Sequence, residues 1–298
     1  FSMGDMFGDD HTPNTTTSAD MDFYHRDLLQ YLTEACHSMP FFFCLGNHEG
    51  EFGYYLKQNP PNNIAVYATN WRKFYFANPF PNGFYTGNSV KEAHGMDLPE
   101  NYYAFTWGDA LFVVLDVYRH CDINEKPQNW DWTLGKTQYD WLKQTLETSK
   151  AKYKFVFAHH VMGTGRGGIE LAKLWEWGGE SQNGQLDFAG QRPNWTTPIH
   201  QLMAANKVSI FFQGHDHIWV RQKLDGVTYQ TLSQPADPNY TLWNADAYLT
   251  GDKFPNTGYT RVSVSPNQVK VDYVRTYLQK DEGPGKVHGE VAFTYTLP

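Results

Sequence analysis

Short apolar runs, rich in β-branched and aromatic residues, recur along the chain and are typical of buried strands. Most are bounded by glycine, proline, asparagine or aspartate, which end strands and form turns. Short turns at 107–109 and 265–267 link neighbouring runs, so each of these pairs is predicted to form a β-hairpin. The predicted strands cover residues 1–3, 41–45, 102–106, 110–115, 153–158, 208–212, 227–232, 259–264, 268–274 and 291–296.

Apolar residues at helical spacing alternate with these strands as far as the run at 208–212. Asp20 or Asp22 would cap the first helix, and Pro40 would stop it. Strands alternating with helices predict an α/β fold, which we expect to form one domain over residues 1–298. The aromatic stretch 50–101 is more typical of a functional surface than of a linker. The predicted helices cover residues 20–39, 71–76, 137–149 and 198–206.

Length and composition are those of a globular domain. The chain has 298 residues, of which 41% are apolar and 19% charged, enough to bury a sizeable core. The net charge of −8 argues against a sequence-independent grip on nucleic acid or on an anionic membrane. No apolar run approaches the roughly 18 residues that a membrane-spanning helix requires. Three cysteines are too few for a disulfide framework.

Residues that suit a metal ion follow four of the predicted strands. Neutral imidazoles bind zinc and iron, and sites in open α/β sheets gather at the carboxyl ends of strands. Each residue alone has an ordinary explanation as a packed or solvated side chain, but four such strand ends in one chain favour a metal site. We expect Gly214 to form a tight turn before the last pair. The candidate residues are Asp5, Asn47, His48, His159, His160, His215 and His217.

These positions fall into short blocks whose order resembles that of the calcineurin-like metallophosphoesterase superfamily, in its purple-acid-phosphatase-like branch. The blocks that carry this resemblance are Gly4-Asp5, Gly46-Asn47-His48-Glu49, His159-His160 and Gly214-His215-Asp216-His217. The segments 102–105 with 112–116 resemble the family's central hairpin, and 258–262 resembles its closing strands. The resemblance therefore covers nearly the whole chain and implies a four-layer α/β/β/α sandwich.

The resemblance also implies a centre of two metal ions. Asp5 would bridge both ions and His217 would bind the second. The residues implied for the first ion are Asn47, His159 and His215. A mixed set of carboxylate, amide and imidazole ligands accepts iron, zinc or manganese. Two such ions would generate a hydroxide nucleophile near neutral pH and hydrolyse a phosphomonoester or phosphodiester.

Two histidines are assigned around this centre by the same resemblance, and Arg166 is considered from the chemistry of its side chain. His48 would act as the general acid that protonates the leaving group. His159 is favoured over His160 as the ligand, which leaves His160 beside the ligands or facing substrate. Arg166 is a tentative substrate-binding residue, because its guanidinium suits a phosphate, although it has an equal explanation as a solvated loop residue.

Two features depart from the family pattern. Purple acid phosphatases carry a tyrosine three residues after the bridging aspartate, where this chain has Gly8, so no purple iron–tyrosinate centre is expected. The family's Asp-x-His block, which precedes the bridging aspartate, is absent. Asp9 and His11 provide the same residue types downstream, but we favour a chain that is incomplete at its N-terminus and lacks the first strand. The metal at His217 would then be the one with fewer ligands.

Two other functions compete with a phosphoesterase that acts on a small phosphorylated substrate. The chain could be a non-catalytic member of the same fold that binds metal or a phosphorylated ligand. It could instead hold a structural metal, although structural zinc sites are closed and rich in cysteine. The family resemblance favours a secreted or periplasmic location, and nothing in the sequence predicts the oligomeric state.

Overall fold

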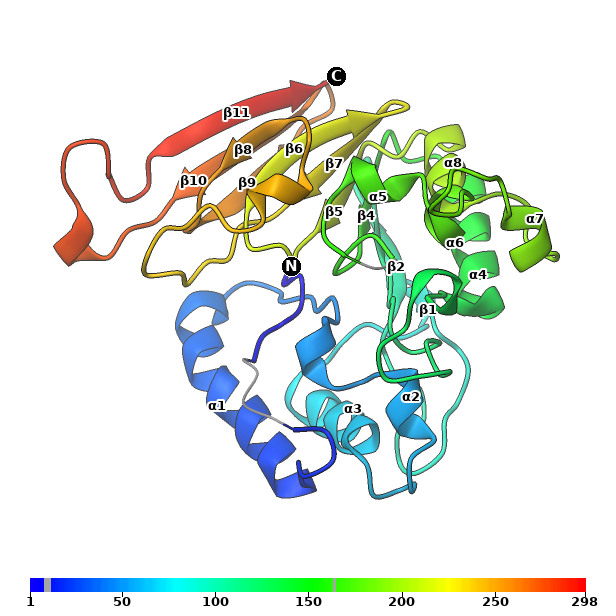
Figure 1. Ribbon diagram of the computed structural model, residues 1–298. Coiled ribbons are helices and arrows are strands. Elements are labelled where there is room, and N and C mark those ends of the chain that lie inside the picture. Colours follow the sequence, from blue (N-terminus) through cyan, green and yellow to red (C-terminus); the bar gives the residue numbers. More distant parts are fainter. Residues whose placement is uncertain (8–11, 163–164) are drawn as a thin grey trace.

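The computed structural model describes residues 1–7, 12–162 and 165–298, which form two β-sheets and several helices (Figure 1). The large sheet has eight strands in the order β1-β2-β3-β4-β5-β7-β6-β8, and the small sheet has three in the order β11-β10-β9. The strands are β1 (Thr86–Gly87), β2 (Tyr103–Trp107), β3 (Ala110–Val114), β4 (Tyr153–Phe157), β5 (Ile210–Gln213), β6 (Trp219–Leu224), β7 (Val227–Thr231), β8 (Asp252–Phe254), β9 (Gly258–Val264), β10 (Val269–Arg275) and β11 (Val291–Leu297).

The helices gather in two groups, with α4, α6, α7 and α8 on one side of the large sheet and α1 beside α3 elsewhere (Figure 1). The α-helices are α1 (Ser18–Cys36), α2 (Gly53–Leu56), α3 (Ile64–Tyr75), α4 (Gly135–Thr148), α5 (Ile169–Ala172), α6 (Trp175–Gly178), α7 (Phe188–Gln191) and α8 (Ile199–Ala205). The 3-10 helices are η1 (Asn47–Glu49), η2 (Asn129–Asp131), η3 (Ala245–Ala247) and η4 (Gln279–Asp281). In the described part of the chain, none of the helices is long and apolar enough to cross a lipid bilayer.

Alternate residues of the central strands pack on opposite faces of the large sheet, because successive side chains of a strand point to opposite sides. Val156 of β4 and Phe211 of β5 belong to the core that includes buried residues of α4 and α8. Phe157 and Phe212, the next residue of each strand, belong to a second core with Val271 of β10 and other residues of the small sheet. Both faces of the large sheet are therefore covered, one by helices and one by a sheet.

The helices α1 and α3 pack against each other and share a small core that includes Met21 and Ile64. Just after α3, the ring of Phe76 packs edge-on against Phe43, with ring centroids 4.9 Å apart. The neighbouring Phe42 faces the core between the two sheets. The two sheets are thus stacked, with helices on the outer face of the large sheet and with α1 and α3 packed beside the segment of Phe42 and Phe43. The predicted α/β fold of the metallophosphoesterase type is confirmed.

The predicted strands at 1–3 and 41–45 are not regular strands in the structure. The two segments run parallel and form a single bridge between Ser2 and Phe43. Ser2 donates its backbone N–H to Phe42 O at 2.9 Å, and Cys44 donates to Ser2 O at 3.0 Å. The prediction of regular strands is therefore wrong, although the two segments lie side by side and both lead to candidate site residues.

The first predicted helix cap was also wrong. The N-cap of α1 is Thr17, whose hydroxyl accepts the backbone N–H of Asp20, while the Asp20 carboxylate accepts the N–H of Thr17. This reciprocal capping box satisfies two backbone donors at once, so the helix begins before the residues that we expected to cap it. The short helix expected at 71–76 is the end of the longer α3, which Asn63 caps by accepting the N–H of Val66.

A buried ion pair connects the loop that follows η1 to α3. Arg72 of α3 and Glu51 are both almost fully buried, and Arg72 Nε lies 2.5 Å from Glu51 Oε1. Arg119 NH1 lies 3.8 Å from the other oxygen of Glu51. Burial alone would raise the pKa of Glu51, but Arg72 and Arg119 lower it. The carboxylate is thus held charged in the interior, where its charge requires both partners.

Replacing Arg72 with methionine should destabilise the protein by about 3–5 kcal/mol, because the charge of Glu51 would remain buried without its main partner. The measurement is the free energy of unfolding in urea. Arg26→Met is the matched control, since Arg26 pairs with Asp22 at 3.6 Å on the surface and its loss should change stability little. Equal stability of the two variants would contradict the importance of the buried pair.

Acid should weaken the fold partly through His25 of α1. Burial lowers the pKa of His25 to about 4, against about 6.5 for an unfolded histidine. Between these values the unfolded chain binds a proton that the folded chain does not, so stability falls as the pH falls through this window. His25→Gln should reduce the loss of unfolding free energy between pH 7 and pH 5 by about 2 kcal/mol. His37→Gln, at an exposed position, should leave that loss unchanged.

Candidate metal centre

The loops after the two bridged segments approach each other through a pair of glycines. Gly4 has a φ of +89°, and a Cβ on it would lie 2.3 Å from Gly46 N. A Cβ on Gly46 would lie 2.3 Å from Oδ1 of Asp5. Neither position has room for a side chain, so the two glycines allow Asp5 to lie directly against η1.

The Glu49 carboxylate holds this contact in place. It accepts the backbone N–H groups of Asp5 at 3.0 Å, Met6 at 2.7 Å and Gly46 at 2.5 Å. Burial raises the pKa of Glu49, and the carboxylate of Asp5 raises it further. His48 donates its own backbone N–H to Asp5 Oδ1 at 3.0 Å. Glu49 is therefore a positioning residue, because it fixes the backbone that carries Asp5.

Three of the candidate ligands form a compact group. One ligand atom each from Asp5, His159 and His215 lies within 4.8 Å of the others. Nε2 of His159 lies 2.9 Å from Asp5 Oδ2 and 3.1 Å from His215 Nδ1. Nδ1 of His159 donates a hydrogen bond to the backbone oxygen of Met3, which turns Nε2 toward the group. Metal-binding histidines are commonly oriented by such a bond from their other nitrogen.

Three of the candidate site residues have a strained backbone. Asp5, His215 and His217 have φ values of 56°, 63° and 52°, in the left-handed region that side chains with a Cβ disfavour. A tight turn does begin at Gly214, whose backbone oxygen accepts the N–H of Asp216 at 2.7 Å, but the left-handed residues are the two histidines that follow. Gly214 also allows a close approach, because a Cβ there would lie 3.0 Å from Cβ of Met3. Such strain is typical of functional sites.

The charge of Asp5 is matched by that of His159. Burial opposes the charged forms of both residues, but their mutual attraction wins, so the pKa of Asp5 is lowered and that of His159 is raised. The pKa values of His215 and His217 are lowered, which favours their neutral forms. Burial and neighbouring histidines lower the pKa of His215, and burial followed by Arg166 lowers that of His217. Neutral imidazoles are the form that binds metal ions.

Asn47 offers the clearest sign that a cation fits. Its Oδ1 is buried and has no hydrogen-bond partner among the described residues. A buried carbonyl oxygen without a partner is costly, and a bound cation would satisfy it. Asn47 also lines a cavity of about 550 Å³, called the first cavity below, together with His48, His160 and His215. The donor set of Asp5, Asn47 and imidazoles therefore fits a metal ion.

His48 and His160 both reach the first cavity but differ in their surroundings. Nε2 of His48 lies 4.0 Å from Asp5 Oδ2. The ring of His160 packs edge-on against Trp132 and Tyr118, at centroid distances of 5.0 Å and 5.5 Å. Burial and then His159 lower the pKa of His160 to about 3. His160 does not belong to the compact group, and it stays neutral at ordinary pH.

His217 does not join the compact group either. It lines a separate cavity of about 380 Å³, called the second cavity below, and its backbone oxygen accepts the amide N–H of Asn256 at 2.7 Å. Asp9 and His11, the alternative ligands considered from the sequence, lie outside the described residues.

Arg166 is bonded to the histidine turn and is also partly exposed to solvent. Its guanidinium donates to the backbone oxygen of His215, and NH1 lies 3.4 Å from Asp216 Oδ1. Asp216 itself is buried and accepts the backbone N–H of Gly167 at 2.8 Å. The side chain of Arg166 is still 39% exposed and lines the second cavity with His217.

Several residues that brace the histidine turn were missed from the sequence. Tyr248 donates its hydroxyl to Asp216 Oδ2 at 2.6 Å, and Asn244 donates its amide to Asp216 O at 2.9 Å. Together with Asn256, they connect the segment 244–256 to the turn. No motif marks them, since they lie some 30 to 40 residues downstream and act through ordinary amide and hydroxyl groups.

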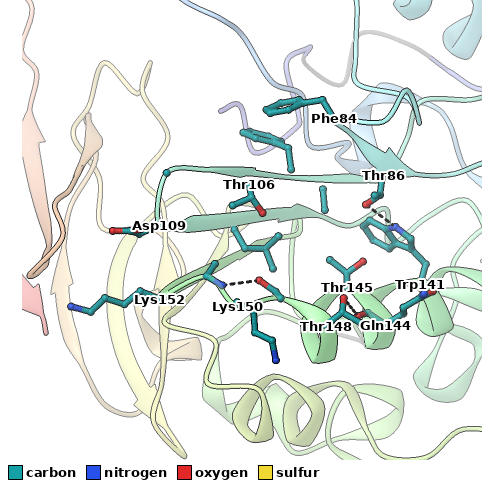
Figure 2. A pocket seen from close by; sticks show the side chains of 16 residues that line it. Phe84, Thr86, Thr106, Asp109, Trp141, Gln144, Thr145, Thr148, Lys150 and Lys152 are labelled. Atoms are coloured by element: carbon teal, nitrogen blue, oxygen red, sulfur yellow. Dashed lines mark hydrogen bonds between the residues drawn. The ribbon is translucent and has the colours of Figure 1, made fainter.

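A larger cavity, of about 630 Å³, lies away from this centre (Figure 2). It is lined in part by the turn between β2 and β3 and by residues 144–145 and 148–152, which precede β4. Figure 2 shows Thr86 hydrogen-bonded to Trp141 at its rim, and Lys152 extending away from it. The cavity lies at the amino end of β4, whereas His159 follows the carboxyl end, and none of the candidate site residues lines it.

Comparisons with known proteins agree with the fold. The family model described as calcineurin-like phosphoesterase matches residues 1–219, so the chain belongs to this family. The resemblance inferred from the motif blocks is therefore confirmed. The curated proteins compared with the chain gave no match.

Two solved structures share the fold. Purple acid phosphatase PPD1 from yellow lupin (Lupinus luteus) seeds is 16% identical, with a TM-score of 0.52, over 94% of this chain and 44% of that one. PhoD is 15% identical, with a TM-score of 0.62, over 99% of this chain and 63% of that one. The chain thus spans less than two thirds of the length of either protein.

The glycine contact predicts that Gly46→Ala damages the centre. The added Cβ would push Asp5 away from His159 and the other ligands, and disturbing the residues that orient a metal ligand commonly costs about 10–100-fold in affinity. The measurement is the affinity for Zn²⁺ or Mn²⁺ by isothermal titration calorimetry, with circular dichroism to check folding. Gly190→Ala is the control, because a Cβ at Gly190 meets open space. Unchanged affinity in Gly46→Ala would contradict the proposed arrangement.

Proposed function

We propose that the chain is a dinuclear metallophosphoesterase that hydrolyses phosphate esters at the centre formed by Asp5, His159 and His215. The observation that carries the proposal is the buried Asn47 oxygen, which lacks a partner among the described residues and lines the same cavity as His215. The site thus offers a cation the ligands of this family beside a cavity large enough for an ester.

The first ion would be held by Asp5 with the three nearby ligands Asn47, His159 and His215. The second would be held by Asp5 and His217. Metal ions bound there supply positive charge for the phosphoryl oxygens and lower the pKa of water. Iron, zinc and manganese all suit this donor set, with availability helping to decide among them.

The protein's own residues would carry the proton and orient the substrate. His48 lies at the edge of the centre and lines the first cavity, so a protonated imidazole there can donate to a leaving alkoxide. His160 is a poor candidate for this role, because its low pKa keeps it neutral. Arg166 is held by the backbone of His215 and directs its charge at the second cavity, where it would bind a phosphoryl oxygen.

The test measures metal content and hydrolysis for the wild-type chain and for His48→Ala. Loss of a general acid typically lowers kcat by about 10²–10⁴-fold, while a residue that is not a ligand should leave metal content unchanged. The substrates are p-nitrophenyl phosphate and bis(p-nitrophenyl) phosphate, and the metal content is measured by elemental analysis. His37→Ala, at an exposed position of α1's C-cap, serves as the control.

The outcomes separate the competing functions. A metal-loaded wild-type chain that hydrolyses neither ester would support a non-catalytic member that binds metal or a phosphorylated ligand. Hydrolysis that survives in His48→Ala would refute the role of His48 but leave the phosphoesterase standing. Loss of metal in His48→Ala would assign this residue to the ligands.

A further inference from the structure

Two cavities reach the candidate centre, and their described lining residues do not overlap. The first, of about 550 Å³, contains His215, and the second, of about 380 Å³, contains His217. Gly165 lines the first and its neighbour Arg166 lines the second. The histidine turn therefore separates two spaces, each of which borders one of the two proposed metal positions.

The first cavity has an aromatic wall joined to the centre. Trp132 packs on His160 at a centroid distance of 5.0 Å and contacts Phe52 at 6.0 Å. Tyr55 also lines this cavity, and its hydroxyl donates to Glu125 at 2.9 Å. Aromatic side chains of this kind provide broad apolar surface with little conformational freedom.

The second cavity is built onto the histidine turn. Asn244 and Asn256 donate side-chain hydrogen bonds to the backbone oxygens of Asp216 and His217. Trp243, adjacent to Asn244, lines the cavity with a side chain that is 53% exposed. These bonds fix the cavity wall relative to a proposed metal ligand. The wall is thus held in a fixed position relative to the place where the phosphoryl group would bind.

The charges of the second cavity favour an uncharged group. Arg166 would be matched by the phosphoryl group itself. The rest of the cavity contains the carboxylate of Asp237 and the neutral amides of Gln234 and Asn244. Asp237 is charged at neutral pH, since hydrogen bonds from Thr241 and its neighbours outweigh burial and lower its pKa. A second negative charge of a substrate would be repelled there, whereas a sugar-like or aromatic group could contact both the amides and the indole.

We propose that the substrate class is a phosphodiester, with one ester arm in each cavity; this rests on the proposed function. A phosphomonoester carries one organic group and would leave one cavity unused. In a diester, both ester oxygens carry groups that extend from phosphorus in different directions. The two separated cavities match these two arms, and the indole of Trp243 contacts the arm that stays on phosphorus.

The positions of His48 and Trp243 assign the leaving arm. His48 lines the first cavity, so the P–O bond to the arm in that cavity breaks and its oxygen takes a proton from His48. Water supplies the new P–O bond and releases one proton, which restores His48. The products are a free alcohol from the first cavity and a phosphomonoester whose remaining arm lies in the second.

The test compares kcat/KM for bis(p-nitrophenyl) phosphate and p-nitrophenyl phosphate in the metal-loaded wild-type chain, Trp243→Ala and Trp243→Phe. We expect the wild type to prefer the diester at least tenfold. Trp243→Ala should lower that preference about tenfold, mainly by raising KM, and Trp243→Phe should restore most of it, because the aromatic face is retained. Leu249→Ala, at an exposed position of the same segment, should leave the preference unchanged.

Two results would overturn the proposal in distinguishable ways. If the wild type hydrolyses the monoester as well as the diester, or if Trp243→Ala lowers kcat/KM for both equally, the diester assignment fails while the phosphoesterase stands. If neither ester is hydrolysed by the metal-loaded chain, the proposed function itself fails, and the diester assignment fails with it.

Discussion

The close contact between Gly4 and Gly46 is the constraint on which the rest of the centre depends. It brings two loops together at backbone distance, and no side chain fits between them. The Glu49 carboxylate then binds three backbone N–H groups across the contact. This arrangement holds Asp5 in a left-handed conformation and directs its carboxylate at His159. The strain of that conformation is tolerated because the contact and its hydrogen bonds over-determine it.

Paired charges and neutral histidines add to this constraint in the buried part of the centre. Asp5 and His159 stabilise each other's charge, while burial keeps His215 and His160 neutral, so the group holds donors ready for a cation inside an acidic protein. Below it, the buried Glu51 and its arginine partners brace the loop that leaves η1. The proposed chemistry therefore depends on carboxylates whose charges are paired and on buried histidines that are neutral before any ion binds.

The fold could be predicted from the sequence where strands are buried on both faces. The runs at β3, β4 and β5 are mostly apolar because one face meets helices and the other meets a sheet. The polar strand β6 and the three-residue β8 carry no such signal and were missed. The segment 41–45 has the composition of a strand but forms only one bridge, since hydrogen-bond pairing depends on a neighbour that composition does not specify.

The sequence by itself determined the candidate ligands, because metal-binding residue types follow the strand ends in a recognisable order and spacing. Tertiary structure alone decided which of them meet. It gathered Asp5, His159 and His215 in one group and left His217 beside a second cavity. It also brought Trp243 and Asn244 to that cavity from a distant segment. The physical reason is that only a few residue types bind metal ions, so candidate ligands can be recognised from the sequence. The walls of a site are made by ordinary side chains, whose positions depend on packing and hydrogen bonds across the whole fold.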